Sequence, residues 1–488
     1  MSLPTSSNLR RGFRFALIEN MLMPIEPLLV MLCASVYAGG EWGTYKLFEA
    51  VVFLFMRIAT MSLDRGLVWM AGRSDRPRYE ALLVRAPIFV CAFGTLLGLG
   101  AVSIYQGYIP GRQYVFGGNL GIGFGELTLF MASIPAMSLG LLASKSLAVH
   151  GDFQTGIVMR TIIKPLLTYG GAFVLYTLSW HGPALATSLL VGELGSTLYG
   201  YYQVARQIQP RFRHFSGPVL LDKKLIRFSV PLMFENFLAS LAARVDIFIL
   251  AGVSGVKSVE VYSIVMIVGK SLVAVRQSFE RVLLAVLSAR GASPDHATKA
   301  SFLWLLERVV GMNLIIVCFI AIWSKPLLGL LGGEYARGAT PLLMFCIIIL
   351  LGTAFDFSST LATALGRTWV APVVQVVNLS LSVLGNLYLI PRYDVMGAMM
   401  AQGFALFASS SIWFIVARKG FAGGLLDFVH IAHAVVPIFL YIPAFVVLFI
   451  NPNMHWVWVL PWYIVAVLIH IGLWHRRGRM VMEGEAQP

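Results

Sequence analysis

The chain has 488 residues, of which 58% are hydrophobic and only 12% are charged. Soluble domains carry roughly 25% charged residues, so this composition excludes a large soluble domain and indicates that lipid is the main solvent. The formal net charge is +14. In a soluble protein that charge would suggest a nucleic-acid partner, but here it is explained by basic loops, and we expect no nucleic-acid partner.

Fourteen apolar segments follow one another along the chain. Each can cross a bilayer core of about 30 Å as a helix, and hydrocarbon leaves no partner for free backbone N–H and C=O groups. We therefore predict an all-α polytopic membrane protein with about fourteen transmembrane helices. The predicted spans are residues 14–37, 43–71, 81–106, 120–144, 156–180, 183–206, 228–252, 258–288, 302–331, 336–363, 369–391, 395–417, 428–450 and 454–475.

The loops between these spans alternate between many and few Lys and Arg residues. By the positive-inside rule this alternation places both termini in the cytoplasm. The longest charged connection, residues 207–227, is basic and contains scattered Phe and Leu residues, which predicts an amphipathic cytoplasmic linker. It separates an N-terminal six-helix lobe, 1–206, from a C-terminal six-helix lobe, 228–417. Residues 418–488 add two further spans and a short cytoplasmic tail.

The two lobes resemble each other in sequence. An offset of 216 residues aligns IENML at 18–22 with FENFL at 234–238, and the same offset aligns SLDRGL at 62–67 with SFERVL at 278–283. It also aligns Gly39 with Gly255. Two polar motifs in one register indicate a parallel repeat, with a pseudo-two-fold axis along the membrane normal and a transport path between the lobes.

Charged residues at membrane depth cost at least about 2.5–3.5 kcal/mol each on insertion scales, so each needs a reason. Most of them lie on the first two spans of each lobe, which suggests that these spans line a common cavity. Four are candidate cations for a phosphate-containing substrate, because guanidinium and ammonium groups bind phosphate oxygens; static pairing inside a lobe is the alternative. These four are Arg57, Arg244, Lys270 and Arg276.

A second group of charged residues is expected to act in coupling or gating. Within it we expect an ion pair in each lobe, Glu19 with Arg65 and Glu235 with Arg281, which is either static or part of a cytoplasmic gate. The whole group comprises Glu19, Glu26, Asp64, Arg65, Glu235, Asp246, Glu280 and Arg281.

Two acids are expected to be isolated inside their spans. Glu126 and Asp356 are therefore candidate proton carriers, since a lone buried carboxylate can bind a proton; a structural hydrogen bond is the alternative. Five other charged residues are expected to anchor spans near the membrane surface. They are Arg160, Lys164, Glu193, Glu307 and Arg308.

The sequence contains no recognisable catalytic constellation: there is no Walker A motif, no HExxH and no nucleophile elbow. The four cysteines stand singly in apolar runs, so they predict neither a disulfide nor a metal site. We therefore expect a protein that is not an enzyme and needs no cofactor or metal.

Several segments resemble the MATE-like MOP flippase superfamily, and in particular its polysaccharide-transporter branch, which includes the O-antigen flippases. The 6 + 6 + 2 arrangement of spans and the basic linker carry part of the resemblance. The matching segments are LIRFSVPL at 225–232, LLGGEY at 330–335, TALGR at 363–367, NLYLIP at 386–391 and Gly397-Ala398.

This resemblance implies two six-helix lobes around a V-shaped cavity, with cavity cations at the positions of Arg57, Arg244, Lys270 and Arg276. It implies alternating-access flipping of an undecaprenyl-diphosphate-linked oligosaccharide, a precursor of lipopolysaccharide or another cell-surface polysaccharide, across the bacterial cytoplasmic membrane. A polysaccharide polymerase and a chain-length regulator would be its partners. Two alternatives stay open: a cation-coupled multidrug or small-molecule antiporter of the same superfamily, and a membrane-integral glycan polymerase or ligase.

Overall fold

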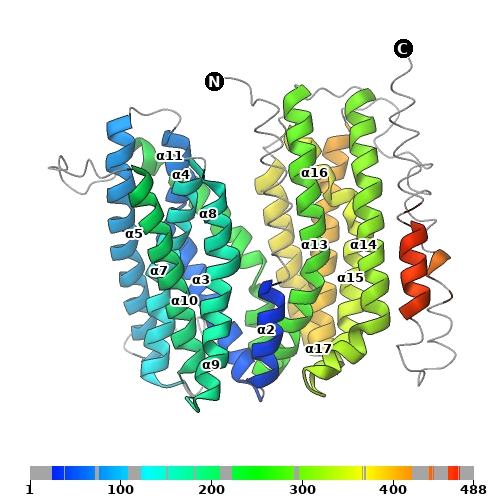
Figure 1. Cartoon of the computed structure of the whole chain (residues 1–488), viewed down its shortest axis with the longest axis horizontal. Coiled ribbons are helices and arrows are strands. Elements are labelled where there is room, and N and C mark those ends of the chain that lie inside the picture. Colours follow the sequence, from blue (N-terminus) through cyan, green and yellow to red (C-terminus); the bar gives the residue numbers. More distant parts are fainter. Residues whose placement is uncertain are drawn as a thin grey trace. The chain divides into compact units, whose positions relative to one another are not determined.

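The computed structural model describes most of the chain and contains no strand in the part that it describes (Figure 1). The described residues are 25–37, 39–71, 76–107, 122–149, 152–180, 183–208, 223–290, 296–364, 367, 370–419, 439–441, 443, 460–470 and 472. Seven helices in this part are long and apolar enough to cross a membrane. The prediction of an all-α, membrane-spanning fold is confirmed.

The helices of the first half follow the predicted spans closely. They are α2 (Ile25–Val36), α3 (Glu41–Thr60), α4 (Leu63–Ala71), α5 (Arg76–Tyr105), α7 (Phe124–Val149), α8 (Phe153–Val158), α9 (Gly171–Thr177) and α10 (Ala184–Ile208). Between α8 and α9 lie two π-helical stretches, η1 (Met159–Ile163) and η2 (Leu166–Gly170).

The second half continues in the same way. Its helices are α11 (Lys223–Ala242), α12 (Val245–Val253), α13 (Val256–Arg290), α14 (His296–Leu330), α15 (Ala339–Asp356), α16 (Ser358–Ala364) and α17 (Val370–Arg418), with a short 3₁₀ helix, η4 (Tyr335–Gly338), before α15. A further apolar helix covers Leu460–His470. Most of the span predicted at 428–450 lies outside the described residues.

Three spans that the hydropathy pattern predicts as continuous are interrupted. Span two breaks between α3 and α4, where Met61 and Ser62 have φ angles of 47° and 53°. Span seven breaks between α11 and α12 at Arg244, whose φ is −140°, and span ten breaks between α15 and α16. Left-handed backbone at a non-glycine residue costs about 1–3 kcal/mol and persists only where its surroundings stabilise it.

The chain divides into two compact units by its internal packing. Unit 1 contains residues 1–264 and 382–395, and unit 2 contains residues 265–381 and 396–488. Helices α11 and α12 therefore pack with the first half of the chain, and the division between the units falls inside α13.

The core of unit 1 is rich in aromatic residues. The rings of Phe48 and Phe130 stack with centroids 5.2 Å apart, and those of Trp42 and Tyr45 lie 5.1 Å apart. Trp42 and Phe48 are fully buried, and such aromatic pairs add about 0.5–1.5 kcal/mol beyond the area that they bury. This core holds α3 against α7 and thereby fixes the side chains that α3 presents elsewhere in the unit.

Two apolar clusters lie among the described residues of unit 2. One contains Phe302, Leu306 and Phe357 and joins α14 to the break between α15 and α16. The other joins α14 to the C-terminal residues: Trp323 packs against Tyr463, and the Tyr463 hydroxyl donates to the carbonyl oxygen of Ile315 at 2.9 Å. The described residues of the last two predicted spans thus lie against α14.

The repeat is visible in the backbone as well as in the sequence. Gly39 precedes α3 with φ of 87°, and Gly255 precedes α13 with φ of 85°. These two glycines are the pair that the 216-residue offset aligns. Glycine adopts positive φ without a steric penalty, which explains its presence at both turns. The equivalent glycines in the two halves therefore share a positive φ.

Candidate functional site

Two of the four candidate cations meet at one aromatic ring in unit 1. The guanidinium carbon of Arg244 lies 3.6 Å from the centroid of Phe53, and that of Arg57 lies 4.9 Å from the same centroid. Cations within about 6 Å of a ring centroid are attracted to its face. Phe53 thus holds two guanidinium groups close to each other despite their like charge.

Local structure explains this placement. Phe53 and Arg57 are four residues apart on α3 and share a face of the helix. Arg244 is the residue at which span seven breaks, and its N–H donates to the carbonyl oxygen of Leu241 at 3.0 Å. The hydropathy pattern gave no sign of this break, so the sequence could not have placed Arg244 on Phe53.

Neither arginine of this pair has an ion-pair partner within 4 Å in the described part of the chain, and the buried Nε of Arg57 has no hydrogen-bond partner there. More distant acids interact with them electrostatically: Asp64 with Arg57, and Glu49 with Arg244. Guanidinium N–H groups bind planar or tetrahedral oxyanions through two parallel hydrogen bonds. The two arginines around Phe53 could therefore bind an anion.

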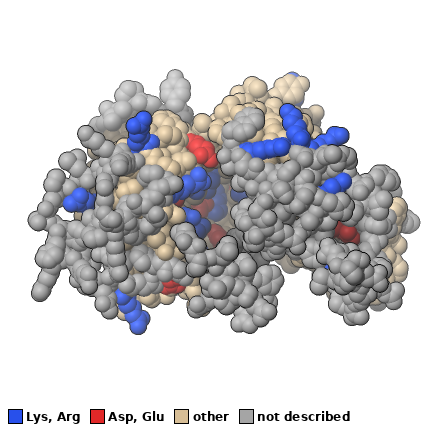
Figure 2. Space-filling view, turned by 90° about the horizontal axis from the view of Figure 1, so that it is seen from above, with Lys and Arg blue, Asp and Glu red and all other residues tan. Residues whose placement is uncertain are grey.

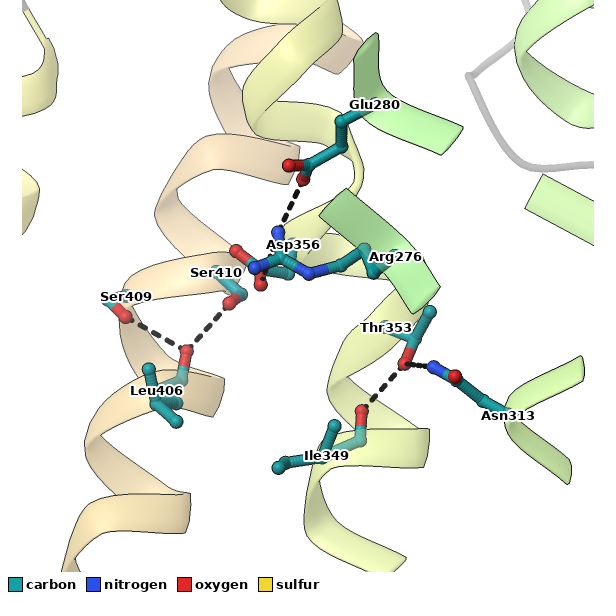
Figure 3. Close-up of polar contacts among 9 residues, drawn as sticks. All are labelled: Arg276, Glu280, Asn313, Ile349, Thr353, Asp356, Leu406, Ser409 and Ser410. Carbon is teal, nitrogen blue, oxygen red and sulfur yellow. Dashed lines mark hydrogen bonds and ion pairs between the residues drawn. The ribbon is translucent and has the colours of Figure 1, made fainter. Parts of the chain in front are cut away.

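Arg276 has a different environment, in unit 2. Its guanidinium contacts Glu280, one turn further along α13, and Asp356 at the end of α15, the latter at 2.7 Å (Figure 3). All three side chains are mostly buried. The expectation that Asp356 is isolated is wrong: the break after α15 brings its carboxylate to Arg276. Two carboxylates therefore balance the charge of Arg276 and leave it poorly suited to bind a further anion.

The ion pair found for Arg65 joins α4 to α11. Arg65 Nη1 lies 3.8 Å from Glu235 Oε1, whereas the expected partner Glu19 lies outside the described residues. The side chain of Arg281, expected to pair with Glu235, also lies outside them. Motif SLDRGL of one half thus contacts motif FENFL of the other.

Two further contacts strengthen this α4–α11 junction. The Asn236 amide donates to the Ser62 hydroxyl at 2.6 Å, at the break between α3 and α4. A Cβ at Gly66 would lie 2.3 Å from Ser229 Oγ and 2.6 Å from a Leu225 methyl carbon, so a larger residue there would require both side chains to move. The hydrogen bond from Asn236 helps to stabilise the left-handed Ser62.

A charge exchange tests the Arg65–Glu235 pair. We expect Arg65→Glu to lower the transport rate two- to fivefold, because it places two carboxylates side by side, and Glu235→Arg to do the same. The effect is modest because both side chains are partly exposed and such pairs contribute about 1 kcal/mol or less. Combining the two substitutions should restore the rate in a proteoliposome assay. No recovery in the double variant would contradict the pairing.

The remaining candidates are spread over several elements. Asp246 is fully buried and accepts hydrogen bonds from the Tyr262 hydroxyl and from the N–H of Ile247. Asp64 is buried in the first turn of α4. The others are more exposed: Glu26 lies in the first turn of α2, Glu126 in the first turn of α7, and Lys270 on α13. Within unit 1, the four acids lie on four different helices, and Lys270 belongs to unit 2.

Two ion pairs in unit 1 were not anticipated. Lys46 Nζ lies 2.7 Å from Glu49 Oε2 on α3, and Lys164 Nζ lies 2.7 Å from Glu193 Oε1. Both were expected to anchor spans near the membrane surface; the structure shows that the Glu193 side chain is only 4% exposed. A three-residue spacing of opposite charges marks the first pair in the sequence. No local sequence signal marks the second pair, because Lys164 and Glu193 lie on different spans, five and six.

The asymmetry of the second pair gives a prediction for stability. Removing Lys164 by Lys164→Met leaves the buried Glu193 carboxylate without its partner, whereas Glu193→Gln leaves a lysine that is 31% exposed and can reach water. We therefore expect Lys164→Met to destabilise the protein more, by roughly 3 kcal/mol, as for other broken buried pairs. Thermal unfolding of the purified variants measures this. A larger loss for Glu193→Gln would contradict the assignment.

Charged side chains of both signs are visible on the described surface, with Lys and Arg more prominent than Asp and Glu, as the net charge requires (Figure 2). Many large apolar side chains of the long helices are also exposed, including those of Leu96, Leu99, Leu198 and Leu384. Large apolar side chains exposed in this number are suited to contact with lipid.

No protein-family model matches the chain, and no curated protein matches it in sequence. Solved structures do match it. The lipid II flippase MurJ in an inward closed conformation has a TM-score of 0.69 and 12% identity over 94% of this chain and 99% of MurJ. An inward-facing multidrug-resistance MATE-family transporter of the MOP superfamily has a TM-score of 0.62 and 14% identity over 82% of this chain and 97% of the transporter.

A third solved structure with the same fold is a MOP-superfamily transporter from Pyrococcus furiosus, described as having a binding pocket of reverse polarity. Its TM-score is 0.60, with 14% identity over 83% of this chain and 93% of the other. At these identities the similarity shows the fold alone. The chain therefore has the fold shared by the lipid II flippase and the MATE transporters.

Proposed function

We propose that this chain is a MOP-superfamily flippase that moves an undecaprenyl-diphosphate-linked oligosaccharide across the bacterial cytoplasmic membrane by alternating access. The observation that carries the proposal is the pair Arg57 and Arg244 on Phe53, without an ion-paired carboxylate in the described residues. Two adjacent guanidinium groups match the two phosphates of such a lipid. The structural similarity to the lipid II flippase MurJ, which extends over 99% of that protein, also supports the proposal.

The contacts between α4 and α11 supply a gate in this proposal. They join the motifs of the two halves, near the predicted cytoplasmic face, through Arg65 with Glu235 and Ser62 with Asn236. Weak, partly exposed pairs are suited to breaking and re-forming in each cycle. Spans thirteen and fourteen of the predicted topology favour the polysaccharide branch, since the antiporters mostly have twelve.

Depletion of the protein followed by lipid analysis tests the function. We expect undecaprenyl-diphosphate-linked glycan to accumulate on the cytoplasmic face, where an enzyme added to inverted vesicles can reach it. The antiporter alternative expects no such accumulation and instead retention of a cationic dye in depleted cells. Accumulation of the same lipid on the outer face would instead indicate a glycan polymerase or ligase.

A further inference from the structure

The ring of Phe53 contacts both arginines of the anion site. The guanidinium carbon of Arg244 lies 3.6 Å from the ring centroid, and that of Arg57 lies 4.9 Å from it. The two guanidinium carbons are therefore no further apart than these two distances taken together. Like charges repel each other at such a separation, and within the described residues neither arginine has an ion-paired carboxylate. The ring is thus a group that both cations share.

The surrounding helices fix the place of Phe53. Helix α3 packs against α7 and also against both parts of span seven, α11 and α12. Arg244 stands at the break between those two parts and so reaches the ring from span seven. Arg57 reaches it from one turn further along α3. The ring therefore determines how far apart two cations from different spans are held.

The contact leaves the hydrogen-bond donors of Arg244 available. Carbon atoms in van der Waals contact are about 3.5–4.0 Å apart, so a guanidinium carbon 3.6 Å from the ring centroid belongs to a group that lies flat on the ring. An edge-on group would bring its nitrogen atoms too close to the ring. A guanidinium is planar and carries its N–H groups in that plane. The ring thus occupies the face of Arg244, and the N–H edge can still bind an oxyanion.

Two forked cations match the oxygen atoms of a diphosphate. Each guanidinium takes two oxygen atoms in a bidentate contact. A diphosphate that joins a lipid to a sugar has two non-bridging oxygens on each phosphate, which gives one guanidinium per phosphate. A phosphate monoester has three non-bridging oxygens on a single phosphorus, so it satisfies one guanidinium fully and the second only by sharing. A fixed pair of arginines therefore favours a diphosphate.

We propose that Phe53 is a positioning residue, whose ring holds Arg57 and Arg244 at the spacing at which each binds one phosphate, so that the site selects a diphosphate over a monophosphate. The inference rests on the proposed function and adds to it the residue that sets specificity for the headgroup. The negative face of an aromatic ring attracts a cation without carrying a charge. The substrate therefore has no ion-paired carboxylate to displace from these arginines.

The test uses the full-length protein in detergent and compares the binding of farnesyl diphosphate with that of farnesyl monophosphate. We expect Phe53→Leu to weaken diphosphate binding about tenfold, as for loss of a desolvated cation–π contact, and monophosphate binding by about twofold at most. The preference for the diphosphate is the decisive quantity, because general destabilisation of the protein lowers both affinities alike.

Fluorinated phenylalanines at position 53 keep the shape of the side chain and serve if Phe53→Leu fails to fold. Successive fluorine atoms withdraw electron density from the ring face and hardly change its size, so a cation–π contact weakens stepwise. We expect the affinity for the diphosphate to fall in the same steps. The matched control is Tyr388 on α17, whose centroid lies 3.6 Å from the guanidinium carbon of Arg392. Tyr388→Phe and its fluorinated forms should bind the diphosphate as the unchanged protein does.

The outcomes separate this inference from the proposed function. If the unchanged protein binds farnesyl diphosphate and Arg244→Ala abolishes binding, but fluorination of Phe53 changes nothing, the anion site stands and the role of Phe53 is overturned. An equal loss of diphosphate and monophosphate binding in Phe53→Leu would overturn its role in specificity. If the unchanged protein does not bind farnesyl diphosphate at all, the anion site and the role of Phe53 both fall.

Discussion

Arg244→Ala is expected to reduce the flipping of an isoprenoid diphosphate by roughly ten- to a hundredfold, because a hydrogen bond to a charged group contributes about 1.5–3 kcal/mol. Arg57→Ala should have a loss of the same order, since its guanidinium lies against the same ring. Arg244→Lys should recover only part of the rate, because an ammonium group keeps the charge but not the forked donor geometry. Flipping is measured in proteoliposomes at equal protein content.

A matched control is available in Arg392. Its guanidinium carbon also lies 3.6 Å from an aromatic centroid, that of Tyr388, but the side chain is exposed and lies on α17. Arg392→Ala removes the same kind of contact and should leave the flipping rate within a factor of two. Full activity of both Arg57→Ala and Arg244→Ala would contradict the proposed anion site.

Arg276→Ala is expected to have the second large effect, on stability rather than on binding. It leaves Glu280 and Asp356 facing each other without their shared cation in a mostly buried place. Breaking a buried ionic group of this kind costs on the order of 3 kcal/mol. The amount of folded protein after heating, measured by size-exclusion chromatography, should fall clearly below that of the unchanged chain.

The triple variant Arg276→Met, Glu280→Gln and Asp356→Asn is the control for charge. It removes all three charges at once, so it should regain much of the lost stability. The neighbouring Asn313–Thr353 hydrogen bond, 3.2 Å long, would be unaffected (Figure 3). A stable Arg276→Ala protein that loses only anion binding would instead support the role in substrate binding expected from the sequence.

Hydropathy was sufficient to predict the helices, since the requirement to satisfy backbone groups in lipid leaves few alternatives. The boundaries of α5 and α13 lie within a few residues of the predicted spans. Hydropathy could not predict the breaks within the spans. Ser62, which is left-handed, accepts a hydrogen bond from Asn236, which is 174 residues away in the chain, and no local pattern reports such a contact.

The same limit applies to the candidate site. The sequence identified Arg57, Arg244 and Arg276 equally as candidate substrate-binding cations. It could not show which of them forms an ion pair with a carboxylate. Asp356 reaches Arg276 only because α15 ends beside α13. Partners contributed by distant elements therefore decide which charges are available to a ligand.

The paired turns at Gly39 and Gly255 carry one more consequence. A Cβ of ordinary handedness would meet no atom within 4 Å at either position, so neither turn lacks room for a side chain. What excludes an L-residue is the positive φ that both turns adopt. The constraint that the two halves still share is therefore one of chirality. D-alanine can adopt the positive φ of either glycine without strain, whereas L-alanine cannot.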